Sequence, residues 1–282
     1  MAKRPIDPAM LRDVHVIRQG EAFDNKAVFY DRERAALRPN LVFVDGDGTV
    51  VFETNEVGLK GDPLDDSRKL AVVWGDSVVF SAGRGWPCLL DRLAPRWQFL
   101  NGGLEGDPYG NVLRRALEFS RQHEVELNLL MLGWHPFAFL PGTSRAQSGN
   151  EGLRSELTRF VETMPNTVVL TVPTALNRRV LETDLSPYLT EGDDDTVFRF
   201  LGNIPCKVEW QRAGFEHILE RNAVAREVCA IMGIRLVDLF AALDSEQQQD
   251  FREHFVDVMH LRKRAHPVVA RIIYDEIRDL LD

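Results

Sequence analysis

Three residues near opposite ends of the chain carry the side chains that acyl transfer needs. Ser77 follows an apolar segment at residues 69–74, whereas Asp257 and His260 lie three positions apart, shortly before the C-terminus. A serine hydroxyl is a weak nucleophile until a base accepts its proton, and an imidazole that a carboxylate orients is suited to that task. These residue types predict a nucleophile at Ser77, a general base at His260 and an orienting carboxylate at Asp257.

The segments that must position these residues alternate between strand-like and helix-like patterns from residue 69 onward. Apolar runs of strand length occupy residues 69–74, 98–100, 127–132, 167–172 and 234–239, and helical patterns lie between them at 111–122, 151–163 and 215–232. Such alternation predicts an α/β fold in which helices cover both faces of a parallel sheet. Because open α/β sheets bind ligands beyond the carboxyl ends of their strands, Ser77 is expected at the functional edge of this sheet.

The first 67 residues show a different pattern. A helix is expected over residues 8–18, and two apolar runs flank an Asp-Gly-Asp-Gly sequence at 45–48, which is typical of a β-hairpin turn. We therefore predict an N-terminal helix and β-hairpin extension over residues 1–67 and one catalytic domain over residues 68–282.

Two stretches of the predicted catalytic domain interrupt the alternation. Residues 136–150 are rich in proline, glycine and serine, and residues 184–212 contain an acidic run. Loops of this length in a compact domain are usually functional or flexible segments. We interpret both stretches as insertions between core elements.

Composition narrows the classes of function. The chain of 282 residues has 34 Lys and Arg against 43 Asp and Glu, a formal net charge of −9. An acidic chain without a long basic run argues against nucleic-acid binding, because phosphate contacts need clustered Lys and Arg. Cys88, Cys206 and Cys229 form no CxxC pair, so neither a disulfide framework nor a zinc site is expected. With no secretory signal and no membrane span recognised, we expect a cytoplasmic protein of open oligomeric state.

The chain resembles the SGNH hydrolases, also called GDSL-like lipases and esterases, in four sequence blocks that occur in the family's order. The Gly-Asp-Ser at 75–77 matches the nucleophile block, and the Asp-Val-Met-His at 257–260 matches the last block, which supplies the carboxylate and the base. The sequence NGGLEGD at 101–107 is similar to the second block, and NEVGLKG at 55–61 is similar to the lead-in before the nucleophile strand. By this resemblance Gly106 donates a backbone N–H to the oxyanion hole, together with the N–H of Ser77.

The third block departs from the family pattern. Members usually carry Gly-x-Asn-Asp after a strand, and the asparagine amide completes the oxyanion hole. Here Gly133-Trp134-His135-Pro136 follows the apolar run, so that His135 stands where the asparagine is expected. A neutral imidazole can donate one N–H to an oxyanion. Trp134 and Phe137 are candidate lining residues of an acyl or aromatic pocket.

The resemblance implies a three-layer α/β/α sandwich of flavodoxin-like type that acts as a serine esterase. Its substrate would be a small-molecule ester, either an O-acyl sugar or a short-chain lipid-like compound, and the chemistry needs no metal or organic cofactor. Because His135 replaces the expected asparagine, two alternative functions stay open. One is an O-acyltransferase that passes the acyl group to a sugar, and the other is a non-catalytic relative that binds a ligand in the same cleft.

A third alternative starts from Asp45 and Asp47. An apolar strand that ends in Asp-x-Asp-Gly-Thr is similar to the start of haloacid-dehalogenase-like phosphatases, in which the first Asp attacks phosphorus, the second acts as acid and base, and Mg²⁺ shields the charge. That family also needs a downstream Lys followed by an acidic pair. Here the acidic run at 193–195 precedes Lys207, and the hairpin interpretation is favoured.

Overall fold

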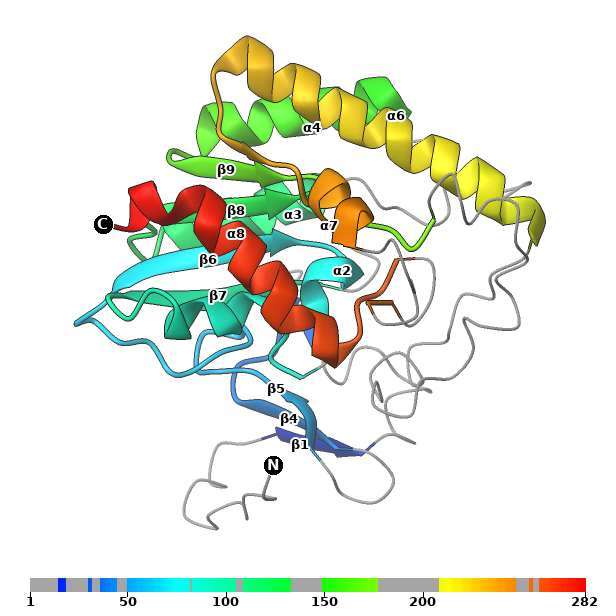
Figure 1. The fold of residues 1–282 in the computed structure, drawn as a ribbon. Helices are drawn as coiled ribbons and strands as arrows, with labels where there is room; N and C mark the ends of the chain where they lie inside the picture. Colours follow the sequence, from blue (N-terminus) through cyan, green and yellow to red (C-terminus); the bar gives the residue numbers. More distant parts are fainter. Residues whose placement is uncertain are drawn as a thin grey trace.

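A computed structural model of the chain describes residues 15–18, 30–31, 36–44, 50–81, 83–104, 109–132, 149–176, 208–246, 254–255 and 259–282. Figure 1 shows a central twisted sheet between two layers of helices, with a smaller sheet beside it near the N-terminus. The three-layer α/β/α fold predicted from the sequence is therefore confirmed.

Five parallel strands form the central sheet, in the order β10-β9-β8-β6-β7. Their bounds are β6 Lys69–Gly75, β7 Trp97–Gly103, β8 Leu127–Met131, β9 Thr167–Leu170 and β10 Leu236–Val237. Each strand falls on one of the apolar runs of the sequence. Strands of a parallel sheet are buried on both faces, which explains why these runs are mostly apolar instead of alternating regularly with polar residues.

Helices cover both faces of this sheet (Figure 1). On one side lie α3 Tyr109–Ser120, α4 Asn150–Thr163 and the later part of α6 Val208–Met232; on the other lie α2 Ser77–Phe80, the 3₁₀ helix η3 Pro87–Arg92, α7 Leu239–Glu246, the short 3₁₀ turn η6 Lys263–Ala265 and α8 His266–Leu281. Successive side chains of β6 point to opposite layers. Val72 and Trp74 pack with α3 and α4, whereas Ala71 and Val73 pack with α8.

Two smaller sheets precede the central one. The first has the order β1-β4-β5, with bounds β1 His15–Arg18, β4 Leu41–Val44 and β5 Val50–Glu53, and the second pairs β2 Tyr30–Asp31 with β3 Ala36–Leu37. β4 and β5 are antiparallel, as the hairpin interpretation predicts. β4 is therefore outside the parallel sheet, and Asp45 and Asp47, which follow it, lie outside the described residues.

Two sequence-based expectations need correction. The helix expected over residues 8–18 is wrong for residues 15–18, which form β1 and pair in parallel with β4. This segment includes Val16 and Ile17, β-branched residues that suit a strand once a partner is available. The bounds of both predicted insertions also change. Helix α6 begins at Val208, so the last five residues of the insertion predicted over 184–212 are helical. Helix α4 begins at the last residue of the insertion predicted over 136–150. The proposed division at residue 67 stays a prediction.

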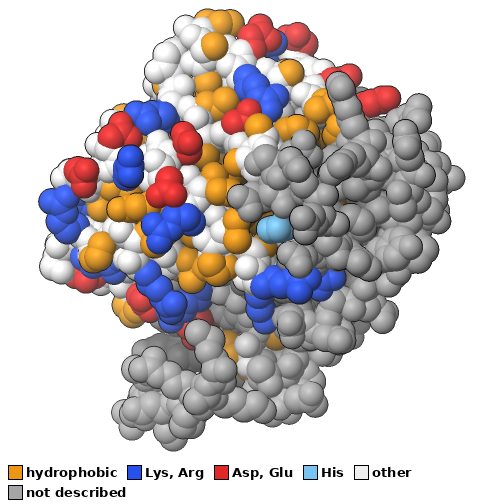
Figure 2. Space-filling model, in the orientation of Figure 1, with side chains coloured by type: hydrophobic (Ala, Val, Ile, Leu, Met, Phe, Trp, Pro, Cys, Tyr) orange, Lys and Arg blue, Asp and Glu red, His pale blue; other side chains and the backbone are white. Residues whose placement is uncertain are grey.

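The surface of the described residues mixes charges of both signs. On the face that carries α8, basic and acidic side chains alternate with apolar ones and form no field of a single sign (Figure 2). None of the described helices combines the length and the apolar character that crossing a membrane requires.

The closing helix α8 is a main contributor to one layer of the core. Val269, Ile273 and Ile277 are completely buried against the sheet. Their spacing of four residues places them on one stripe of the helix.

We expect Ile273→Ala to lower the free energy of unfolding by about 2–5 kcal/mol, because the substitution leaves a cavity in a close-packed core. Ile231→Ala is the matched control, since Ile231 is 73% exposed on α6, and its change should stay within about 0.5 kcal/mol. Urea unfolding of both variants measures the difference. Equal losses of stability would contradict the packing described for α8.

Candidate active site

Ser77 lies at the junction between strand β6 and helix α2. β6 ends at Gly75, Asp76 is the N-cap of α2, and Ser77 is the first residue of that helix. The Asp76 carboxylate accepts a hydrogen bond of 3.0 Å from the backbone N–H of Val78, which satisfies one of the free donors at the start of the helix. A cap and a single helical turn thus present Ser77 at the carboxyl end of β6.

Two glycines allow α2 to lie directly against the ends of the strands. A Cβ atom on Gly75 would lie 2.5 Å from Val79 Cγ2, and one on Gly103 would lie 2.3 Å from the backbone nitrogen of Phe80. Atoms cannot approach so closely without moving the helix. Gly75 belongs to the first sequence block and Gly103 to the second, so both blocks contain a glycine that the packing of α2 requires.

The structure brings Ser77 and His260 together from positions 183 residues apart. His260 Nε2 lies 2.9 Å from Ser77 Oγ, and both residues are buried, each with 6% of its surface exposed. When Nδ1 of the imidazole carries the ring proton, Nε2 can accept the proton of the serine hydroxyl. This is the geometry in which a base activates a serine nucleophile.

Backbone contacts hold the segment that carries His260. Phe255 and Leu261 form an antiparallel bridge across it, and the N–H of Arg262 donates to the carbonyl of His254 at 2.8 Å. The guanidinium of Arg262 donates from Nε to the carbonyl of Phe255 at 2.8 Å. These contacts hold the backbone directly after His260, immediately before η6 and α8.

His266, the first residue of α8, contacts the backbone next to His260. Its imidazole is 5% exposed and hydrogen-bonds the backbone of Leu261, the neighbour of His260. Burial, together with the nearby charges of Lys60 and Lys263, lowers the pKa of His266 to about 4, although the bond to Leu261 opposes this shift. The folded protein therefore holds His266 in its neutral form near pH 7.

Arg115 of α3, in the helical layer opposite α8, binds the same edge of the sheet. Its guanidinium donates to the carbonyl of Gly102 at 2.6 Å and to the carbonyl of Gly75 at 3.4 Å, and it lies 5.7 Å from the ring of Trp74. Gly75 and Gly102 are at the carboxyl ends of β6 and β7. Nothing in the sequence around Arg115 indicates this contact, because its partners are backbone carbonyls of distant strands.

Five of the residues assigned from the sequence lie outside the described residues. They are Asp257 of the expected triad, Gly106 and His135 of the expected oxyanion hole, and the two lining candidates Trp134 and Phe137. The geometry reported for this site is therefore that of Ser77 and His260 together with the elements that hold them.

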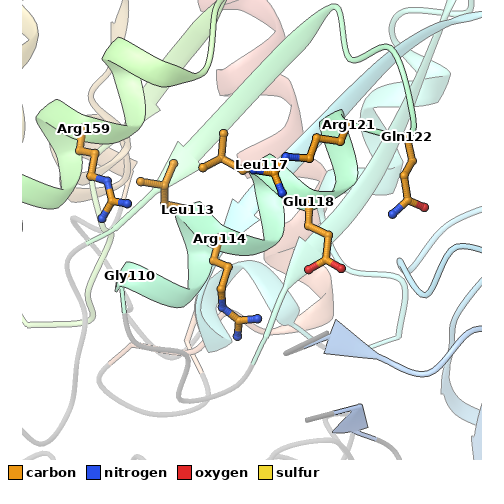
Figure 3. Close-up of a pocket in the computed structure, with 8 residues that line it drawn as sticks. All are labelled: Gly110, Leu113, Arg114, Leu117, Glu118, Arg121, Gln122 and Arg159. Carbon is orange, nitrogen blue, oxygen red and sulfur yellow. The ribbon is translucent and has the colours of Figure 1, made fainter. Parts of the chain in front are cut away.

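A surface pocket of the described residues lies away from this pair. It has a volume of about 570 Å³ and is lined by Gly110, Leu113, Arg114, Leu117, Glu118, Arg121, Gln122 and Arg159. Figure 3 shows these side chains along α3, with Arg159 approaching from α4. Neither Ser77 nor His260 lines this pocket. The described residues also contain no cluster of three or more His, Cys, Asp or Glu side chains that could hold a metal ion.

The lowered pKa of His266 predicts how stability changes with pH. Unfolding returns the imidazole to its ordinary pKa of 6.5, whereas the folded state takes up the proton only near pH 4. The stability contributed by neutral His266 is thus complete above pH 6.5 and is lost as the pH falls toward 4.

Wild type should therefore lose more stability between pH 7 and pH 5 than His266→Asn, which keeps a side-chain N–H for Leu261 but does not titrate. The difference between the two slopes should approach about 1.4 kcal/mol per pH unit, the value for one proton. Urea unfolding at several pH values measures it. Parallel curves for the two proteins would contradict the buried, neutral state of His266.

Comparisons with known proteins show likeness in structure but not in sequence. No protein-family model and no curated protein matches the chain. Among solved structures, a lipase/acylhydrolase from Enterococcus faecalis is 17% identical and superposes with a TM-score of 0.54 over 76% of this chain and 97% of its own.

Two further solved structures show the same likeness. An alpha/beta hydrolase enzyme from the metagenome of Lake Arreo, Spain, is 19% identical with a TM-score of 0.57, covering 77% of this chain and 98% of its own. A variant of an acetyl xylan esterase from Geobacillus stearothermophilus is 16% identical with a TM-score of 0.54, covering 76% and 96%. The chain therefore shares the α/β/α fold of these solved hydrolases.

Proposed function

We propose that the protein is a serine hydrolase that cleaves acyl esters. The observation that carries this proposal is the distance of 2.9 Å between Ser77 Oγ and His260 Nε2 at the carboxyl edge of the sheet. A fold shared with solved esterases and acylhydrolases supports it, because this edge is where open α/β sheets place their ligands.

In the proposed mechanism Ser77 Oγ attacks the ester carbonyl while His260 Nε2 takes the hydroxyl proton. Asp257 accepts a hydrogen bond from Nδ1 and keeps the imidazole in the required tautomer. His260 then gives its proton to the leaving alcohol, which departs and leaves the acyl group on Ser77. A water molecule that the same base deprotonates attacks the acyl-enzyme, and the carboxylic acid is released as Ser77 regains its proton.

The proposed oxyanion hole combines the backbone N–H groups of Ser77 and Gly106 with the side chain of His135. Donors of this kind act on the negative charge that develops on the carbonyl oxygen in the transition state. The rigid placement of Ser77 on a capped helix supports its part in the hole, because a preorganised donor needs no rearrangement during the reaction.

We propose small esters as substrates, either O-acyl groups on sugars or short-chain lipid-like esters, with Trp134 and Phe137 lining the acyl pocket. The solved relatives include an acetyl xylan esterase and a lipase/acylhydrolase, which span these two classes. Transfer of the acyl group to a sugar hydroxyl would use the same acyl-enzyme, with the sugar in place of water. Product analysis with and without an added sugar acceptor separates hydrolysis from transfer.

Ser77→Ala should lower kcat for p-nitrophenyl acetate by at least about a thousandfold, because the acyl-enzyme cannot form without the hydroxyl. Ser67→Ala is the matched control, since Ser67 is exposed and, within the described part of the chain, hydrogen-bonds its neighbour Asp65. Steady-state kinetics of both variants tests the proposal. Unchanged hydrolysis by Ser77→Ala would refute the role of Ser77 as nucleophile.

His135→Asn tests the unusual member of the proposed oxyanion hole. If His135 donates to the oxyanion, the shorter asparagine side chain places its N–H differently and should change kcat by up to about a hundredfold to a thousandfold. A fall in kcat shows that the imidazole is the better donor at this position, and a rise in kcat shows that it is a poor donor. Rates with acetyl and longer acyl p-nitrophenyl esters measure the effect. Unchanged rates for every ester would remove His135 from the oxyanion hole.

A further inference from the structure

The helix that carries Ser77 is a single turn and depends on external partners at its carboxyl end. A helix leaves its last carbonyl groups without intrahelical donors, and one turn is not stable alone. In α2 the carbonyl of Val78 accepts hydrogen bonds from Ser81 Oγ at 2.7 Å and from Trp86 Nε1 at 3.2 Å. The next carbonyls along the chain are bound by two buried polar side chains, Asn101 and Lys60.

Asn101 binds the end of α2 from strand β7. Its Nδ2 lies 2.9 Å from the carbonyl oxygen of Val79, 3.1 Å from that of Phe80 and 3.0 Å from that of Arg84. Its Oδ1 accepts from the backbone N–H of Gly103 at 2.9 Å, which fixes the orientation of the amide. Asn101 is 1% exposed, so water does not compete for these bonds.

Lys60 binds the same end of α2 from the N-terminal segment. Its Nζ donates to the carbonyls of Phe80 and of Ser81, the latter at 2.9 Å, and the residue is completely buried. The ammonium group also lies 3.7 Å from the centre of the Phe80 ring and 5.7 Å from that of Phe52. Burial lowers the pKa of Lys60 to about 7. A buried amine is costly, and here two carbonyls and two aromatic rings compensate it.

The two side chains converge because their backbones are paired. Lys60 N–H donates to Asn101 O at 3.1 Å, and Asn101 N–H donates to Lys60 O at 2.8 Å, an antiparallel bridge on the edge of β7. The ring of Phe52 from β5 packs edge-on against that of Phe80, with 5.2 Å between their centres. The segment before residue 68 thus contacts the helix that carries Ser77 directly.

We propose that Lys60 and Asn101 are positioning residues, which fix the carbonyl end of α2 and thereby keep Ser77 Oγ within reach of His260. This inference rests on the proposed role of Ser77 as nucleophile. Asp76 holds the first turn of α2 from within the helix, whereas Lys60 and Asn101 hold its other end from outside. A four-residue helix that is loose at one end can tilt, and a displacement of about 1 Å at a nucleophile can cost a hundredfold in rate.

Lys60→Met and Asn101→Asp remove the donors and keep the size of each side chain. We expect each to lower kcat for p-nitrophenyl acetate by about tenfold to a hundredfold with KM within about twofold, because the nucleophile is misplaced while the ester still binds. Lys60→Gln, which keeps an amide donor, should recover part of the loss. If Lys60→Met does not fold, Asn101→Asp still tests the same contact with the end of α2.

Two matched controls separate positioning from general stability. Asn128 on β8 is also 1% exposed, but its amide donates to Pro165 and its oxygen accepts from Trp74, so Asn128→Asp disturbs the sheet without touching α2. Lys69 is exposed and lies over the Trp97 ring at 5.1 Å, so Lys69→Met removes a lysine elsewhere. Both controls should keep kcat within about twofold, measured on folded protein well below each melting temperature.

The outcomes distinguish this inference from the function on which it rests. Lower kcat in Lys60→Met and Asn101→Asp with both controls active supports the positioning role. Wild-type kcat in these two variants, or an equal loss of kcat in Asn128→Asp, overturns that role while Ser77-dependent hydrolysis by wild type stands. If wild type shows no Ser77-dependent hydrolysis, the proposed function fails and the inference fails with it.

Discussion

The contact between Ser77 Oγ and His260 Nε2 is the constraint on which the account of this protein depends. It joins two residues 183 positions apart at a distance of 2.9 Å. One partner is fixed by the end of β6, and the other directly precedes Leu261 and Arg262, whose backbone contacts lie just before α8. Small shifts of either element would break the contact, so the packing of the sheet and of the closing helix serves the site as well as the stability of the fold.

The helix that carries Ser77 shows how the rest of the molecule stabilises an element too short to be stable alone. α2 has four residues, and its cohesion comes from a cap at Asp76, from close contact with Gly75 and Gly103, and from side chains that bind its carbonyls. One of these side chains, Lys60, belongs to the N-terminal segment. That segment is therefore linked to the site by direct hydrogen bonds, although the sequence pattern sets it apart from the parallel sheet.

The sequence predicts the parts of the structure that local patterns encode. The apolar runs mark β6 to β10 because both faces of these strands are buried, and the order of blocks identifies Ser77 and His260 as partners because their side chains have complementary chemistry. Residues 15–18 were expected to be helical and form β1 instead, because pairing with β4 overrides the local pattern. Lys60 and Asn101 lie within the blocks at 55–61 and 101–107. Their contacts, like those of Arg115, could not be predicted from the sequence, because each side chain binds backbone carbonyls of remote segments.

The pairing of Ser77 with His260 is tested by the reaction of the folded protein with a serine-directed fluorophosphonate, followed by mass spectrometry of the intact chain and of its peptides. We expect one phosphonyl group per chain, carried by Ser77, because only a serine that a base activates reacts quickly with such a reagent. We also expect His260→Gln to slow this labelling strongly. Failure of the folded wild type to react, or labelling on a serine other than Ser77, would contradict the assignment of the site.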